Sequence, residues 1–415
     1  MTATPTGLAQ LLDIPAAGHD APRERRTVGD DSKRTVFRNA RIVLRDEVVK
    51  GSLEVADGRI ARVDTGNCTV RAAIDLEGDY LLPGLVEVHT DNLERHLMPR
   101  PKVRWAEMPA LLAHDAEVAA AGITTVFDAL GVGEADTDSL RGSDWQRVLA
   151  TLDTAGTLDL LRADHHLHAR CELPAPNTLE LFEPFRGHRR LSLISLMDHT
   201  PGQRQWEDIG QARTYYLGKK GWSEEKFERQ VAQAARLQAR HAEPNRRFFV
   251  DYCRSHGIAM ASHDDTTAQH VEQAHAEGAI MSEFPTTLVA ARAARKRGLL
   301  TVMGGPNVVR GGSHSGNVSA AELGRLDLLD ILSSDYVPGS LLSAVLRLVH
   351  DDICSLPQAV RAVTCAPAQA TGLHDRGAIE RGLRADLVQV RFAEVPDAGA
   401  QAVVRAVWRE GRRVL

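Results

Sequence analysis

The feature that most constrains the fold is an alternation of strand-like and helix-like segments between about residues 81 and 370. The strand candidates are short apolar runs, and several of the helical stretches between them end at a glycine, such as Gly122, Gly278 or Gly298. The candidate strands are residues 81–89, 123–130, 158–171, 190–200, 258–265, 279–285, 299–305 and 330–338. Eight such units predict an α/β fold of the (β/α)8 TIM-barrel type, with its functional groups at the carboxyl ends of the strands. A doubly wound open sheet is the competing architecture.

Two β-rich ends bracket this middle section. Short β-like pieces between residues 35 and 80 are separated by glycines, and residues 371–415 have the same texture. We therefore expect a small β-sandwich domain built from 35–80 and 371–415, beside a barrel of residues 81–370. Residues 1–34 are rich in Thr, Pro, Asp and Arg, which predicts a flexible amino-terminal arm.

Charge and cysteine content narrow the class of protein. The chain has 50 Lys and Arg against 55 Asp and Glu, a net charge of −5, so no global basic field predicts a nucleic-acid partner. The five cysteines are scattered and form no C-x-x-C pair, which indicates a reducing compartment. We see neither a signal peptide nor an apolar span of membrane length. The sequence therefore predicts a cytoplasmic protein with no membrane partner.

Metal-ligand residue types recur at the ends of the predicted strands. His89 and Asp91 lie two residues apart on one strand, so both side chains face the same way and could bind one ion. The other strand-end groups are His166, His168, Glu172, Asp198, His199, His263, Asp264, Asp265, Glu283 and Asp335. A mixture of imidazole and carboxylate suits Zn²⁺, Mn²⁺ or Fe²⁺, and such an ion lowers the pKa of a bound water from 15.7 to about 7. A single strand-end His or Asp is more often a cap, so the prediction depends on the whole set.

The segment "LLPGLVEVHTD" resembles the first-strand signature of the amidohydrolase superfamily, Pro-Gly-hydrophobic-acid-hydrophobic-His-x-His. Two positions depart from that pattern: Asp91 stands where the second histidine usually lies, and Glu283 lies near the usual sixth-strand histidine. The resemblance covers residues 35–415 and implies a metal-dependent hydrolase. It also implies that Asp335, after the eighth strand, is the general base.

A narrower resemblance joins several blocks between residues 87 and 320. Blocks such as "EVHTDNLERHLMPRPKVRW", "HHLHARCE", "SHDDTT" and "GGPNVVRGGSHSGNVSA" together resemble a family of diphosphatases of phosphonate breakdown. That family hydrolyses the 5-triphosphate of a ribose 1-methylphosphonate to the 5-phosphate and pyrophosphate. The resemblance implies one or two divalent ions, most simply zinc. The implied ligands are His89, Asp91, Glu172, His199, His263 and Asp335. Further ligand candidates are His168, Asp264 and Glu283, while Asp335 activates water and His314 or His96 protonates the leaving group.

Such a substrate, a small phosphorylated sugar, is strongly anionic, so a protein of net negative charge needs a local basic pocket to bind it. Basic residues follow the His89–Asp91 pair closely, and residues 311–317 form a glycine-rich loop of phosphate-binding composition. The candidate substrate-binding residues are Arg95, Arg100, Lys102, Arg104, Arg204, Lys219, Arg310 and Ser313.

Three other functions are compatible with parts of this pattern. A deaminase or cyclic-amide hydrolase would leave the basic loop unexplained. A nucleotide-polyphosphate hydrolase needs a pocket for a base, which we cannot locate. A non-catalytic scaffold predicts that the strand-end groups bind no metal. The sequence leaves the oligomeric state open, a homodimer included.

Overall fold

The computed structural model describes residues 34–66, 68–101, 103–133, 145–218, 221–312, 317–397 and 399–415. Apart from Arg34, the predicted amino-terminal arm lies outside the described residues. The same holds for four predicted site residues, Lys102, Lys219, Ser313 and His314.

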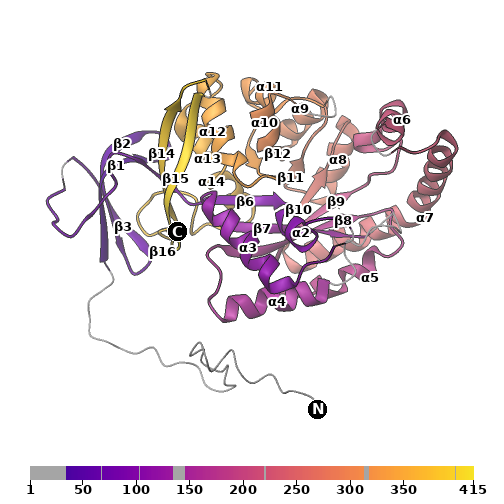
Figure 1. The fold of residues 1–415 in the computed structure, drawn as a ribbon. Coiled ribbons are helices and arrows are strands. Elements are labelled where there is room, and N and C mark those ends of the chain that lie inside the picture. Colours follow the sequence, from indigo (N-terminus) through magenta and orange to yellow (C-terminus); the bar gives the residue numbers. More distant parts are fainter. Residues whose placement is uncertain are drawn as a thin grey trace, which may run out of the picture. The chain divides into compact units, whose positions relative to one another are not determined.

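Eight parallel strands form the centre of the molecule, in the order β13-β12-β11-β10-β9-β8-β7-β6 (Figure 1). Backbone hydrogen bonds close this sheet on itself: Asp335 N–H donates to the His89 carbonyl at 3.1 Å, and Asp91 N–H donates to the Asp335 carbonyl at 3.0 Å. The closure confirms the barrel and excludes the open sheet. The strands are β6 (Leu85–Thr90), β7 (Ile123–Val132), β8 (Asp164–Glu172), β9 (Leu191–Met197), β10 (Ala259–His263), β11 (Met281–Glu283), β12 (Leu300–Gly304) and β13 (Ile331–Ser333).

Helices surround the barrel, and local signals in the sequence set their ends. Thr267 and Thr287 cap two consecutive helices by accepting a hydrogen bond from the backbone three residues on, and Gly278 and Gly298 end them with φ of 95° and 77°. The helices are α2 (Asn92–Leu97), α3 (Glu107–Ala120), α4 (Trp145–Thr157), α5 (Thr178–Phe182), α6 (Ile209–Gly218), α7 (Glu224–His256), α8 (Ala268–Glu277), α9 (Leu288–Arg297), α10 (Gly305–Arg310), α11 (Ala320–Arg325), α12 (Ser340–His350), α13 (Leu356–Arg361) and α14 (Cys365–Ala370), with short 3₁₀ turns at Glu183–Phe185 and Arg204–Trp206. No helix among the described residues is long and apolar enough to cross a membrane.

The barrel interior is layered. Its apolar layer is formed by one residue from most strands: Phe127, Leu193, Ala261, Met281, Val302 and Ile331. Because side chains alternate with a period of two, the residues two positions further along these strands also face inward. On four of the strands these are polar, namely Ser195, His263, Glu283 and Ser333. The sequence thus places a polar layer directly above an apolar plug.

Strands from both ends of the described chain form a second, largely antiparallel sheet, in the order β16-β15-β14-β5-β1-β2-β3, with β4 beside β1. Figure 1 shows β14 and β15 (yellow) in this sheet with β1 and β2 (indigo). The strands are β1 (Arg34–Val43), β2 (Val48–Ala56), β3 (Arg59–Thr65), β4 (Ile74–Asp75), β5 (Tyr80–Pro83), β14 (Leu387–Val395), β15 (Gly399–Arg409) and β16 (Arg412–Arg413). The predicted boundary between residues 80 and 81 falls within β5.

Candidate functional site

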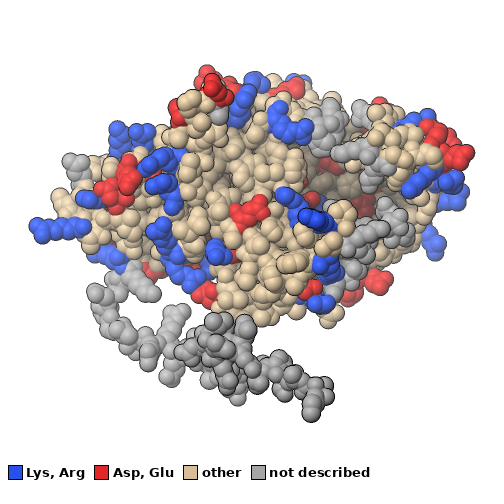
Figure 2. Space-filling view, in the orientation of Figure 1, with Lys and Arg blue, Asp and Glu red and all other residues tan. Residues whose placement is uncertain are grey.

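A cavity of about 210 Å³ opens at the carboxyl ends of the barrel strands. Its lining includes His89, Arg170, His199, His263, Asp264, Phe284, Asn307, Arg310, Asp335 and Tyr336. On the face shown in Figure 2, Lys and Arg side chains are interspersed with Asp and Glu and form no broad basic patch.

Three ligand-type atoms converge on this cavity. The Nε2 atoms of His199 and His263 each lie 3.7 Å from Oδ2 of Asp264, and the three groups together could hold a metal ion. His199 follows β9 and His263 ends β10, so neighbouring strands of the barrel bring them together. Asp264 turns into the cavity from a backbone φ of 54°, a left-handed conformation that aspartate tolerates better than most residues.

Buried carboxylates orient both histidines from behind. His199 Nδ1 lies 2.6 Å from Glu172 Oε2, and His263 Nδ1 lies 3.2 Å from Glu283 Oε2. Each contact leaves Nε2 facing the cavity, which is the usual arrangement of metal-binding histidines. Burial alone would lower the pKa of His199, but the charges of Glu172 and Asp264 raise it to about 9.

A second group, His89, His168 and Glu283, lies deeper in the barrel. His89 Nδ1 is 3.2 Å from Glu283 Oε1, and His89 also lines the cavity. His168 has both ring nitrogens occupied: Nδ1 contacts the Val88 carbonyl at 2.9 Å and Nε2 contacts Ser195 Oγ at 2.5 Å. Burial lowers the pKa of His168 to about 3.

Asp335 follows β13 and lines the same cavity as the histidines. Its backbone is fixed by the hydrogen bonds that close the barrel, and Thr90 Oγ1 donates to its carbonyl at 2.8 Å. Burial raises the pKa of Asp335, and the nearby charge of Asp91 adds to the shift. A carboxylate so placed can accept a proton from a water molecule in the cavity.

Asp91 is not grouped with the histidines. Its Oδ1 atom is 2.9 Å from Nη1 of Arg170, whose Nη2 lies 3.4 Å from Glu94 Oε1. Arg170 was not among the residues predicted from the sequence. The signal was present, because Arg170 lies midway between His168 and Glu172 and so must face inward with them.

The predicted basic residues are placed very differently from one another. Of those described, Arg310 lines the cavity. Arg95 donates to the Tyr336 carbonyl, Arg104 contacts Glu107 at 3.5 Å, and Arg100 is exposed. Arg204 is buried against Asp265 at 2.6 Å and donates to the His263 carbonyl, so it braces the site from outside the cavity. His96 contacts Glu117 at 2.8 Å, also away from the cavity lining.

A third group of ligand-type residues, His114, Asp128 and His165, is fully buried between α3 and strands β7 and β8. None of these residues belongs to the lining of the cavity. These residues were not among those predicted from the sequence: Asp128 and His165 face outward from strands β7 and β8, and His114 lies on α3, which packs over them.

The chain was compared with known proteins. No family model matches it. It is 46% identical over 381 residues to the alpha-D-ribose 1-methylphosphonate 5-triphosphate diphosphatase of Escherichia coli strain K12, a match that covers 91% of this chain and all of that protein.

Solved structures of the same fold include a 5-methylcytosine deaminase from Klebsiella pneumoniae, with a TM-score of 0.60, 16% identity and coverage of 92% of this chain and 98% of that one. A molinate hydrolase matches with a TM-score of 0.61, 14% identity and coverage of 93% and 95%. An N-acetyl-D-glucosamine-6-phosphate deacetylase from Mycobacterium smegmatis matches with a TM-score of 0.57, 16% identity and coverage of 92% and 99%. At these identities the likeness concerns the fold. The 46% identity to the E. coli protein is much higher and extends over nearly the whole chain. The chain therefore belongs to the alpha-D-ribose 1-methylphosphonate 5-triphosphate diphosphatase family, built on the amidohydrolase fold.

Proposed function

We propose that this protein hydrolyses the 5-triphosphate of α-D-ribose 1-methylphosphonate, in phosphonate catabolism, to the 5-phosphate and pyrophosphate. The observation that carries the proposal is the 46% identity to the E. coli diphosphatase along 91% of the chain. The described residues that line the cavity agree with it, because they combine metal-type ligands with the guanidinium groups of Arg170 and Arg310.

A divalent metal fits the residues present. The Nε2 atoms of His199 and His263 face the cavity, and no described residue offers either of them a hydrogen bond, while Asp264 supplies an oxygen beside them. We propose these three residues as the principal ligands, with His89 and Asp335 across the cavity and Glu172 and Glu283 orienting the rings. Two nitrogens and an oxygen favour zinc. A bound ion would polarise phosphoryl oxygens and lower the pKa of a water molecule.

The chain's own residues supply the remaining functions. Asp335 is positioned to orient a water molecule and accept its proton, while Phe284 and Pro285 form an apolar wall on the cavity. Guanidinium groups can neutralise charge on the phosphate oxygens. All five cysteines are free, which supports placing the enzyme in a reducing compartment such as the cytoplasm.

The test is a phosphorus NMR assay of the metal-reconstituted protein with the ribosyl triphosphate. Equal amounts of pyrophosphate and 5-phosphate are expected from the wild type and from His350→Ala, a control that removes an exposed histidine of α12. Chelation should stop both reactions. If folded, metal-loaded protein leaves the triphosphate intact, the proposed function is wrong. If orthophosphate forms in place of pyrophosphate, the enzyme cleaves a different phosphoanhydride bond from the one proposed.

A further inference from the structure

Arg170 occupies a position that metal chemistry does not explain. It lies on β8, where His166, His168, Arg170 and Glu172 share the inward face, and it is the uppermost basic group of that face. Its side chain is 13% exposed, and it lines the cavity beside His89, His199 and Asp335. A guanidinium group held in a largely buried site is costly unless its charge is paired.

Two carboxylates pair that charge and fix the orientation of the group. Asp91 contacts Nη1 at 2.9 Å and Glu94 contacts Nη2 at 3.4 Å, and the Glu94 oxygen that does so also accepts the Gly131 backbone N–H at 2.7 Å. Nε of Arg170 is buried, yet no described residue accepts its hydrogen. Nη1 and Nη2 each carry a second hydrogen, so a planar guanidinium held in this orientation is preorganised to offer further donors to an anionic oxygen.

We propose that Arg170 binds a phosphate group of the substrate, and that Asp91 is not a metal ligand but the counter-ion that orients the Arg170 guanidinium. This inference rests on the proposed phosphoanhydride substrate. Among the described residues of the cavity lining, guanidinium groups come from Arg170 and Arg310, and Arg170 is the less exposed of the two. Burial strengthens its interaction with a phosphate oxygen, because water screens it less.

The position of Asp91 carries the second part of the proposal. Asp91 directly follows β6 and turns toward β8, where Arg170 takes one of its oxygens. The group of His199, His263 and Asp264 forms without it. Removal of the Asp91 charge should therefore leave the metal content of the protein unchanged and weaken the binding of phosphates by loosening Arg170.

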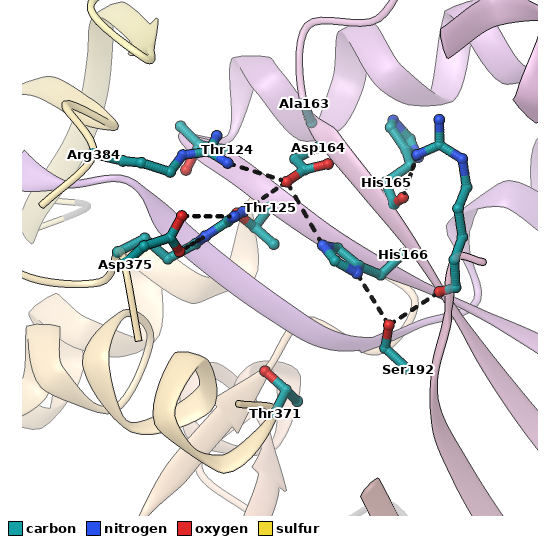
Figure 3. Close-up of polar contacts among 12 residues, drawn as sticks. Thr124, Thr125, Ala163, Asp164, His165, His166, Ser192, Thr371, Asp375 and Arg384 are labelled. Atoms are coloured by element: carbon teal, nitrogen blue, oxygen red, sulfur yellow. Dashed lines mark hydrogen bonds and ion pairs between the residues drawn. The ribbon is translucent and has the colours of Figure 1, made fainter. Parts of the chain in front are cut away.

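The chain offers a matched control at the opposite end of the barrel. Arg376 is also buried, and its Nη1 lies 2.7 Å from Asp164 Oδ2, at the start of β8. Figure 3 shows Asp164 within a polar group with His166, Asp375 and Arg384, while His166 also reaches Ser192. Arg376→Gln thus breaks a comparable buried ion pair without touching the cavity lining.

The experiment measures binding of inorganic pyrophosphate to zinc-loaded protein by calorimetry, together with zinc content by mass spectrometry. The affinity of Arg170→Gln should fall about 10- to 100-fold, the loss expected for a hydrogen bond to a charged group, with zinc content unchanged. Arg170→Lys should recover part of the affinity, because lysine keeps the positive charge but lacks the two parallel N–H donors of a guanidinium. Arg376→Gln should bind pyrophosphate as the wild type does.

Two results would overturn the proposal. Wild-type affinity in Arg170→Gln would remove Arg170 from phosphate binding, and loss of zinc in Asp91→Asn would make Asp91 a ligand. If Arg170→Gln does not fold, the double variant Arg170→Gln/Asp91→Asn removes both charges and supplies the same test. Because pyrophosphate binding needs no turnover, failure of the proposed reaction would leave this measurement intact.

Discussion

Two histidine and carboxylate groups in this molecule have the same composition and very different surroundings. In the cavity group, His199, His263 and Asp264, the candidate ligand atoms lie within 4.8 Å of one another. In the sealed group, His114, Asp128 and His165, they do so as well. The residue types and the distances between their ligand atoms therefore do not distinguish the cavity group from the sealed group. What separates them is how the hydrogen-bonding capacity of each ring is used.

In the sealed group every ring nitrogen has a partner. His114 Nδ1 accepts from the Asn92 amide at 3.0 Å and its Nε2 lies 2.7 Å from Asp128. His165 contacts Asp128 through Nδ1 at 2.8 Å and Asp115 through Nε2 at 3.3 Å. Since all these contacts are buried, the group joins α3 to β7 and β8, and a metal could bind its rings only by replacing these hydrogen bonds.

In the cavity group each histidine has one nitrogen held by a buried carboxylate and the other open to the cavity. The comparison teaches that a candidate metal site is recognised by unpartnered ligand atoms beside a cavity, more than by the residues that compose it.

His263→Ala should abolish metal binding and lower the turnover rate about 10³-fold or more, because the metal supplies several kcal/mol of charge stabilisation in such reactions. The free energy of unfolding of the metal-free protein should change little, since the ring borders a cavity. Metal content, kcat and urea denaturation of the same preparation provide the measurement. Full zinc occupancy in the variant would contradict the ligand assignment.

His165→Ala should produce the opposite pattern. Removal of the imidazole takes away the cation that the buried Asp115 and Asp128 share and leaves Asp115 with Arg162 and Asp128 with His114, which costs about 3–5 kcal/mol of unfolding free energy. Zinc content per folded molecule should stay at the wild-type value. Denaturant titration of the metal-free protein measures the loss, with the exposed His350→Ala as a control expected within about 0.5 kcal/mol of wild type. Zinc loss in His165→Ala would mean that the sealed group binds metal.

The parts of this molecule that the sequence predicted are those set by local periodicity. All eight barrel strands were expected, because apolar runs and glycine stops mark them directly, although the third was expected to begin at residue 158 rather than Asp164 and the eighth to end at residue 338 rather than Ser333. The neighbourhood of His199 and His263 then follows from the order of the strands in the barrel. The sequence identified Asp264 as a candidate, but it could not predict the direction of the side chain. That direction depends on a left-handed backbone conformation, which sequence spacing does not reveal.

The basic run after β6 shows where such reasoning stops. The loop composition indicated positive charge near the site, yet Arg95 and Arg104 contact neighbouring protein groups and lie outside the cavity lining. Loop side chains have no fixed period, so their direction cannot be inferred from spacing. Arg170 is the converse case: its direction followed from the period of β8, and only its partners Asp91 and Glu94 required the structure.

The sealed group also predicts a pH dependence of stability. Burial alone would lower the pKa of His165, but Asp128 and Asp115 raise it to about 9, above the ordinary value of 6.5. The charges around this ring come from Asp115 and His114 on α3, Asp128 on β7 and, through Asp115, Arg162. Because the folded-state pKa is the higher one, the stabilisation is complete below pH 6.5 and is lost as the pH rises through 9.

The expected loss across that window is roughly 3 kcal/mol. It should appear in denaturant titrations of the metal-free protein between pH 6 and 9.5, and it should be much reduced in His165→Gln, which cannot titrate. An equally steep loss in His165→Gln would assign the pH dependence to other groups.

Glu172→Gln should give the smallest effect and the finest distinction between the two groups. The Glu172 carboxylate lies 2.6 Å from Nδ1 of His199, so its charge increases the basicity of the Nε2 atom that faces the cavity. Neutralising it should weaken zinc affinity about 10- to 100-fold, in line with other carboxylates behind metal-bound histidines. Asp115→Asn makes the same change behind His165 and should lower stability without altering zinc affinity. Zinc competition titrations of both variants measure the difference. If the two variants bind zinc with equal affinity, the carboxylate behind His199 is structural too. The two groups would then differ only in that one of them borders a cavity.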